Sequence, residues 1–268
     1  MIISWPRVSF ALGNASQLLI SSILPSILRL ALIFSTGFAC HSNAQDQIAE
    51  YSAQYQANAN GIAATAERSL MEISDGSYQL SNTLQATLGG QTIANLQQSS
   101  TFEIRDNIVT PSSYSYLLTG ISSASNAIAY NWNALIALST EDDESWQLEL
   151  SSQVMDQLSY QFALRRNLIA GTRSDAALEF KIIDGDEIEQ HQYRIMGNEV
   201  LLTPLGQLNT VKLERIRAQT DPRSTIIWLA ADWEFLLARI EQVNRSGLKI
   251  ELELQEAVVS GQEVTALN

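Results

Sequence analysis

The sequence is 268 residues long and carries 29 acidic against 16 basic residues, a net charge of −13 at pH 7. A surface this acidic repels phosphate groups, so the composition argues against a nucleic-acid partner and against binding to anionic lipid headgroups. A chain of this length can bury one sizeable core, and we expect a single folded domain.

The first 44 residues have the composition of a secretory signal peptide. Their cations are Arg7 and Arg29, and they contain no Asp or Glu. An uncharged, mostly apolar run, 30–39, follows Arg29, and residues 42–44 (Ser-Asn-Ala) have the small-x-small pattern of a cleavage site. The pattern predicts a signal peptide over 1–44, a new N-terminus at Gln45 and a periplasmic protein.

A transmembrane anchor and a lipoprotein signal are two other interpretations of this segment. Pro25 and Arg29 interrupt the apolar stretch, which disfavours a transmembrane anchor, so we expect no transmembrane span in the mature protein. Gly37-Phe38-Ala39-Cys40 resembles a bacterial lipobox, although Gly37 stands where such motifs usually have Leu. Lipidation of Cys40 would anchor the protein to a membrane, whereas cleavage after Ala44 would remove the single cysteine and exclude any disulfide.

Residues 48–132 alternate strand-forming runs with turn signals. Asn60-Gly61, Asp75-Gly76 and Gly89-Gly90 are typical of tight hairpin turns. The runs between them predict strands over 48–57, 62–73, 78–88 and 92–104. We expect Pro111 to stop the pattern, which resumes over 114–118. Same-face aromatic pairs, such as Tyr51 with Tyr55 and Tyr130 with Trp132, indicate cross-strand packing rather than a ligand box.

Residues 152–169 have the pattern of an amphipathic helix. The residues that recur at intervals of three and four are Met155, Leu158, Phe162 and Arg165. We expect Ser152 to cap the first turn and Gly171 to end the helix. Such a helix would lie across one face of the sheet or close its open end.

The second half returns to strands. We predict them over 176–183, 189–196, 198–202, 208–218, 225–231, 235–243 and 248–258. Asp184-Gly185 marks a turn, and residues 259–268 have no pattern and are expected to form a disordered tail. The predicted fold is mainly β: a single domain over 45–258, with a curved antiparallel sheet or half-open barrel and the helix 152–169 packed against it.

Several short motifs occur in an order that is similar to a known family. They are Asp156-Gln157-Leu158-Ser159, Thr203-Pro204-Leu205-Gly206 before Thr210-Val211-Lys212, Trp228-Leu229-Ala230-Ala231-Asp232, and Arg239-Ile240 before Leu252 and Leu254. Together they resemble the exported bacterial proteins grouped as domain-of-unknown-function family 3108, over about residues 47–258. One departure is Ala238, where the family often has proline before the basic residue. The resemblance implies an envelope location and a mostly antiparallel β fold, without an established activity.

The sequence offers few groups for catalysis. His191 is the single histidine after residue 44, and we expect a surface strand histidine rather than a general base. Ser246-Gly247-Leu248-Lys249 matches a Ser-x-x-Lys pattern, but it falls on a turn and its partner motifs are missing. The acidic run 141–144 lacks the spacing of a calcium loop, and one histidine without cysteine does not make a zinc site. We therefore expect no enzyme, no cofactor and no metal.

Four residues near the second half's aromatic cluster are the candidates for ligand binding: Trp228, Asp232, Phe235 and Arg239. In one interpretation Asp232 and Arg239 form an ion pair at the mouth of a cavity lined by Trp228. In the other, which we favour, Asp232 lies in a turn and Arg239 covers apolar surface.

We expect a periplasmic, non-enzymatic protein that binds an apolar or amphipathic, lipid-like ligand within a curved sheet. The alternative is a cell-envelope interaction or assembly protein that docks a partner through a sheet edge or the helix 152–169.

Overall fold

The alternating sequence forms long antiparallel strands, which the computed structural model describes over residues 48–105, 107–171 and 177–267. The predicted signal peptide, its cleavage site before Gln45 and the lipobox at Cys40 lie outside these residues, as does Ala176 at the expected start of one strand. Within the described residues no helix is long and apolar enough to span a bilayer.

The strands of the first half are β1 Tyr51–Ala59, β2 Ile62–Ser74, β3 Ser77–Leu88, β4 Gln91–Arg105, β5 Ile108–Gly120, β6 Ala124–Asn131, β7 Ile136–Glu141, β8 Glu144–Glu149 and β9 Val154–Met155. The helix α1 Ser159–Ile169 follows. The second half contains β10 Leu178–Asp184, β11 Glu187–Thr203, β12 Gly206–Ile216, β13 Ser224–Ala230, the 3₁₀ turn η1 Ala231–Trp233, β14 Leu236–Val243, β15 Lys249–Val259 and β16 Gln262–Glu263.

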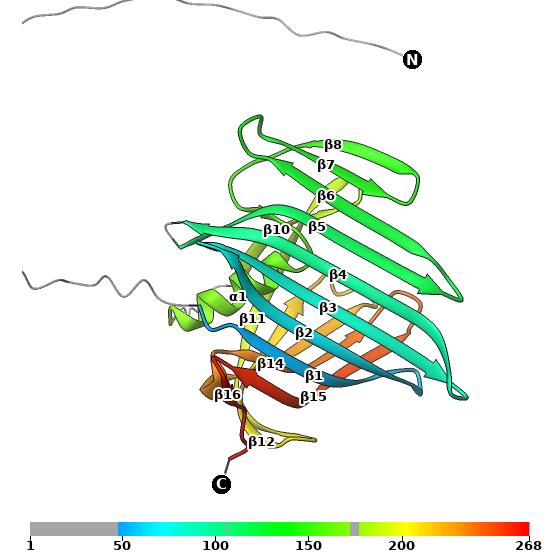
Figure 1. Ribbon diagram of the computed structural model, residues 1–268, viewed down its shortest axis with the longest axis vertical. Helices are drawn as coiled ribbons and strands as arrows, with labels where there is room; N and C mark the ends of the chain where they lie inside the picture. Colours follow the sequence, from blue (N-terminus) through cyan, green and yellow to red (C-terminus); the bar gives the residue numbers. More distant parts are fainter. Residues whose placement is uncertain (1–47, 106, 172–176, 268) are drawn as a thin grey trace, which may run out of the picture. The chain divides into compact units, whose positions relative to one another are not determined.

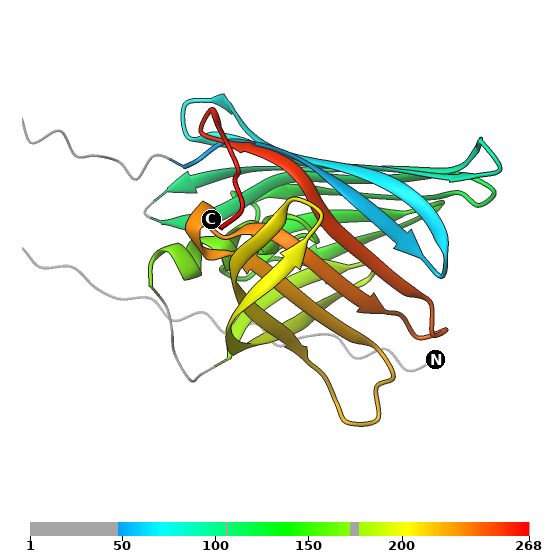
Figure 2. The same ribbon diagram turned by 90° about the horizontal axis from the view of Figure 1, so that it is seen from below.

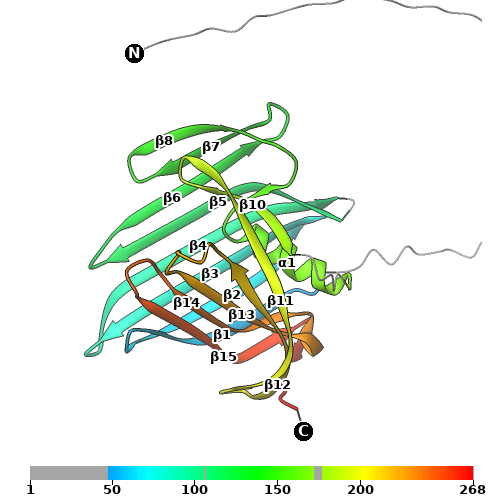
Figure 3. The same cartoon turned by 180° about the vertical axis from the view of Figure 1, so that it is seen from behind.

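These strands form one continuous open sheet. Its order is β8-β7-β6-β5-β4-β3-β2-β1-β15-β14-β13-β12-β11-β10-β9, with β16 beside β15. The sheet curves so that β1 to β8 form one layer and β10 to β15 the other (Figures 1 and 3). In Figure 2 α1 lies between the layers at one end, where it contacts β4, β5 and β10. We call the face toward α1 the inner face. The expected mainly β fold with one helix against a curved sheet is confirmed.

The hairpin turns follow from the residues predicted to make them. Asn60 and Gly61 both have positive φ, 50° and 89°, and join β1 to β2 as an Asn-Gly turn requires. In β1, Tyr51, Ala53, Tyr55 and Ala57 are buried while the residues between them are exposed. The strands predicted over 62–73, 78–88 and 92–104 are likewise present, extended by one or two residues.

The helix is shorter than predicted: it begins at Ser159, and the turn that leads into it is held by Asp156 rather than capped by Ser152. The buried Asp156 carboxylate accepts the backbone N–H groups of Leu158 at 2.9 Å and Ser159 at 2.8 Å. Ser100 Oγ on β4 also donates to this carboxylate, at 2.8 Å. Residues 154–155, which we had assigned to the helix, instead form β9 and pair in parallel with β10. Gly171 follows the helix with φ 78°, as expected.

Three other predictions are corrected. Pro111 does not stop its strand, because β5 runs through it with a bulge at Ser112, opposite Thr101 and Phe102 of β4. The strands expected over 189–196 and 198–202 are one strand, β11, with a bulge at Met196, between Ile195 and Gly197. The tail expected over 259–268 is ordered in its described part: residues 262–263 pair with β15, and Val264 is buried.

Candidate functional site

Two apolar rows of cross-strand partners cross the inner face. The first row is Leu254, Tyr55, Ala66, Leu84, Leu96 and Leu118. The second is Ile227, Ile240, Leu252, Ala57, Ala64, Ala86 and Ala94. At the ends of these rows Leu96, Leu118, Ala86 and Ala94 are partly exposed. The half of the inner face that lies away from α1 therefore presents apolar surface to solvent.

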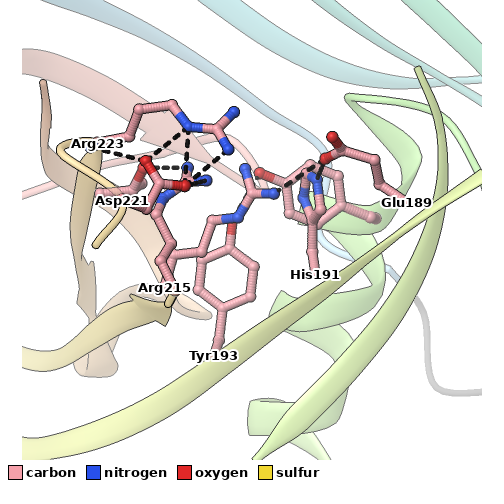
Figure 4. Close-up of polar contacts among 9 residues, drawn as sticks. Glu189, His191, Tyr193, Arg215, Asp221 and Arg223 are labelled. Atoms are coloured by element: carbon pink, nitrogen blue, oxygen red, sulfur yellow. Dashed lines mark hydrogen bonds and ion pairs between the residues drawn. The ribbon is translucent and has the colours of Figure 1, made fainter. Parts of the chain in front are cut away.

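A polar cluster lies on the inner face of the other layer (Figure 4). Glu189 and His191 of β11 approach to 3.0 Å, and Arg215 of β12 donates to the same Glu189 carboxylate at 3.2 Å. The hydroxyls of Tyr193 and Tyr160 are 3.0 Å apart, which connects β11 to α1. The cluster joins strand and helix through hydrogen bonds and ion pairs.

His191 is buried, so its prediction as a surface histidine is wrong. Its side chain is 3% exposed, and the ring lies 5.6 Å from the Tyr160 ring, edge to face. Burial, with the cations Arg215 and Arg217 nearby, lowers the pKa of His191 to about 4, so the imidazole is neutral at pH 7. A general base also needs a nucleophile within hydrogen-bond reach. The groups closest to the His191 ring are instead the Glu189 carboxylate and the Tyr160 ring.

The loop after β12 extends the same cluster. The Asp221 carboxylate accepts from the Arg223 guanidinium at 2.7 Å, and Arg217 lies 3.9 Å away. The hydrogen bonds from Arg223 hold the pKa of Asp221 well below its usual range. Each of the arginines 215, 217 and 223 thus has a carboxylate beside it. This cluster is internally neutralised, which suits a structural role.

A second group of cations lies under α1, around a small cavity of about 30 Å³ that is lined by residues of the helix and of both layers. Its polar wall contains Tyr51 and Arg68 from β1 and β2, and Gln161 and Arg165 from α1. Its apolar wall includes Ile227, Leu229, Leu237 and Ile240. Ile227 and Ile240 are also the first pair of the second apolar row. The cavity therefore lies at one end of that row and places polar groups beside it.

The four predicted ligand residues do not share one site. Trp228 is buried on the outer face, between Lys212 at 4.9 Å and Arg239 at 5.6 Å from its ring centroid. Asp232 is exposed in η1 and accepts from Asn209 at 2.7 Å instead of pairing with Arg239.

Arg239 forms an ion pair with Glu253 and donates to the Leu202 carbonyl at 3.0 Å. Of the four, Phe235 alone lines the cavity under α1. Glu234 and Phe235 both have φ 54°, so the chain reverses direction at these two residues before β14 begins. The strand predicted over 235–243 therefore begins one residue later, and the interpretation of Asp232 and Arg239 as separate surface residues fits the contacts.

The outer face carries a larger groove of about 470 Å³. Ser52 and Gln54 of β1, Glu67 of β2 and Glu256 of β15 line it. These side chains alternate with the inner ones along their strands, so the groove lies on the opposite face from the apolar rows. Leu205, Val258 and Val264 line it as well, so the groove has a mixed polar and apolar lining and is open to solvent, unlike the mostly apolar, enclosed pocket that is typical of small-molecule sites.

The other motifs considered in the sequence lie at turns. Ser246 and Gly247 form the turn between β14 and β15, where the Asn244 side-chain oxygen accepts the backbone N–H groups of Ser246 and Leu248. The acidic run 141–144 spans the β7–β8 turn. Within the part of the chain that the structure describes, no group of three His, Cys, Asp or Glu residues is placed to hold a metal ion.

Two residues of the cavity were missed as site residues. Arg68 and Arg165 are far apart in the sequence, but each had a local signal. Arg68 takes the inward position in the alternation Ala64, Ala66, Arg68, Leu70. Arg165 falls on the apolar face of the predicted helix, at the spacing of Leu158 and Phe162, which already indicated an inward-facing cation.

The fold and inner face define a barrel-like, open antiparallel sheet with one helix inside it. The family model described as "Protein of unknown function (DUF3108)" matches residues 50–253, so the chain belongs to that family, as its motifs had suggested. The chain is similar in structure to a beta-barrel-like protein of domain of unknown function DUF1849 from Brucella abortus. That likeness has 8% identity and a TM-score of 0.51, and it covers 80% of this chain and 98% of the other.

A DUF1329 family protein from Desulfovibrio piger ATCC 29098 also aligns, with 13% identity and a TM-score of 0.21 over 78% of this chain and 84% of the other. No curated protein matches the sequence. At 8% identity the likeness to the DUF1849 protein bears on the fold alone.

Proposed function

We propose that the protein is a non-enzymatic periplasmic binding protein that holds an amphipathic ligand on the inner face of its curved sheet. The observation that carries this proposal is the pair of apolar rows, of which the first ends in partly exposed Leu96 and Leu118 and the second in partly exposed Ala86 and Ala94. An apolar surface that lies inside a fold and still meets solvent is a typical ligand surface.

Export supports the same proposal. The N-terminal composition predicts cleavage before Gln45, with lipidation at Cys40 as the alternative. In the periplasm, a strongly acidic outer surface keeps a carrier soluble, while its apolar ligand is shielded from water between the layers.

Titration with the neutral fluorescent probe 1-N-phenylnaphthylamine tests this function. Leu118 faces inward and its neighbour Leu117 is 46% exposed on the outer face, so they form a matched pair. We expect saturable probe binding that Leu118→Asp weakens by about tenfold or more and Leu117→Asp leaves unchanged, because a carboxylate on apolar surface removes its affinity for apolar groups.

Circular dichroism would confirm that both variants fold. Absence of saturable binding to the wild-type protein, or equal effects of the two substitutions, would contradict a ligand surface on the inner face.

A further inference from the structure

The cavity under α1 holds two guanidinium groups that are oriented by hydrogen bonds rather than by acids. Arg68 Nε donates to the Tyr51 hydroxyl and its Nη1 to Gln161 Oε1, both at 2.9 Å. Arg165 is 5% exposed, its Nε donates to the Glu234 carbonyl, and its guanidinium carbon lies 5.0 Å from the centroid of the Tyr51 ring. Tyr51 therefore connects the two arginines.

Both terminal nitrogens of Arg165 are buried without a hydrogen-bond partner. Among residues 48–105, 107–171 and 177–267, no carboxylate lies within ion-pair distance of Arg68 or Arg165. The Glu234 carboxylate acts on Arg165 only from beyond ion-pair distance, where it raises the pKa of Arg165 against the effect of burial. The two terminal nitrogens of Arg165 keep unused N–H groups and present the fork that binds a carboxylate, so an anion would complete them.

The cavity and its walls limit what that anion is. A volume of about 30 Å³ has room for roughly two water molecules, which is the space that the two oxygens of a carboxylate require. Ile227 and Ile240 on the opposite wall begin the apolar row toward Leu252 and Ala57. A ligand with a carboxylate at one end and an apolar chain at the other matches both parts.

We propose that Arg165 and Arg68 bind the carboxylate of a single-chain amphiphile whose chain lies along the apolar rows. This proposal rests on the proposed function, and it adds the chemical class of the head group and the residues that select it. Arg165 supplies the two free donors, and Arg68 adds positive charge beside them while Tyr51 and Gln161 hold it in place.

Competition for bound 1-N-phenylnaphthylamine tests the proposal. The competitors are dodecanoate, dodecanol and dodecyl phosphate, which share a chain length and differ in the head group. We expect the wild-type protein to prefer dodecanoate over dodecanol by about tenfold or more, the range of a charge-assisted hydrogen bond. Preference for dodecyl phosphate over dodecanoate would overturn the assignment of a carboxylate.

Variants locate the effect. Arg165→Met and Arg68→Met keep much of the apolar bulk and should remove the preference while the neutral probe still binds; Arg165→Lys should retain part of it. Arg245→Met removes one charge from an exposed turn and should change nothing.

Probe binding without a preference for dodecanoate in the wild-type protein would overturn the carboxylate site and leave the carrier function standing. No probe binding would overturn both. A preference that persists in folded Arg165→Met and Arg68→Met would place the anion elsewhere.

Discussion

Two arginines of this protein lie over aromatic rings, one on each face of the sheet, and their surroundings differ. On the outer face Arg239 covers Trp228 and pairs with Glu253. Lys212, on the strand at the other side of Trp228, pairs with Glu199 at 3.6 Å. Below α1, Arg165 covers Tyr51, and no acid of the described residues pairs with it.

The difference separates a structural cluster from a binding site. On the outer face an acid, a base, a tryptophan, a base and an acid follow one another across neighbouring strands: Glu199, Lys212, Trp228, Arg239 and Glu253. Each cation there has an acid beside it, so the charges are satisfied within the protein. The inner pair has donors left over in a place that water barely reaches, which an external anion would complete.

The largest expected effect is on the outer face. Trp228→Ala should cost about 3–5 kcal/mol in the free energy of unfolding, because it removes a buried aromatic side chain and leaves Lys212 and Arg239 without their ring. Urea unfolding measures this cost. Binding of the neutral probe to the folded variant should be unchanged; its loss without a loss of stability would return Trp228 to the ligand site that the sequence had suggested.

Acid provides the next largest effect. Because the folded-state pKa of His191 is about 4 and an unfolded histidine has a pKa of about 6.5, the unfolded state binds the proton first as pH falls. Stability from this group is complete above pH 6.5 and is lost between pH 6.5 and 4, by about 3 kcal/mol.

Glu189, Arg215 and Arg217 face His191. Burial acts to raise the pKa of Glu189, but its hydrogen bond to His191 and the nearby cations outweigh burial, so the pKa is lowered. Protonation of Glu189 therefore adds a further loss of stability at more acidic pH. Denaturant titrations of wild type and His191→Gln at pH 7 and 4.5 isolate the histidine. An equal fall in both proteins would assign the pH dependence to other groups.

How much of this arrangement follows from the sequence depends on how local the signal is. The Asn-Gly and Asp-Gly turns and the alternation in β1 are local, and they predicted the hairpins and the inward Tyr51 and Tyr55 correctly. The start of α1 was predicted wrongly because Ser100, 56 residues away, helps to hold Asp156 in place.

The candidate site is harder to predict because it joins distant segments. Trp228 and Arg239 attracted attention as conspicuous residue types, yet pairing with Lys212 and Glu253 turns them into a surface cluster. Arg68 and Arg165 meet only when β2 and α1 are packed against the same cavity.

The inner arginine should give a stability change of the opposite sign to that of Trp228. Arg165→Met removes an uncompensated buried charge, so we expect the ligand-free protein to unfold at the same temperature as wild type or a higher one. Thermal unfolding followed by circular dichroism measures it. A clear fall in the unfolding temperature would show that Arg165 is a structural residue.

The smallest effect belongs to Arg239. Its side chain is 21% exposed and its partner Glu253 is 34% exposed, so solvent screens the pair. Arg239→Met should therefore cost roughly 1 kcal/mol or less in urea unfolding, with the preference for dodecanoate intact. A change in that preference would show that the two faces are coupled.

The central claim is tested most directly by mass spectrometry of the protein purified from cell envelopes without detergent, intact and after organic extraction. We predict a mature chain that begins at Gln45 and a carboxylate-bearing, single-chain amphiphile at close to one per protein. A protein that carries no amphiphile, and that takes up neither dodecanoate nor the neutral probe when they are added, would contradict the account.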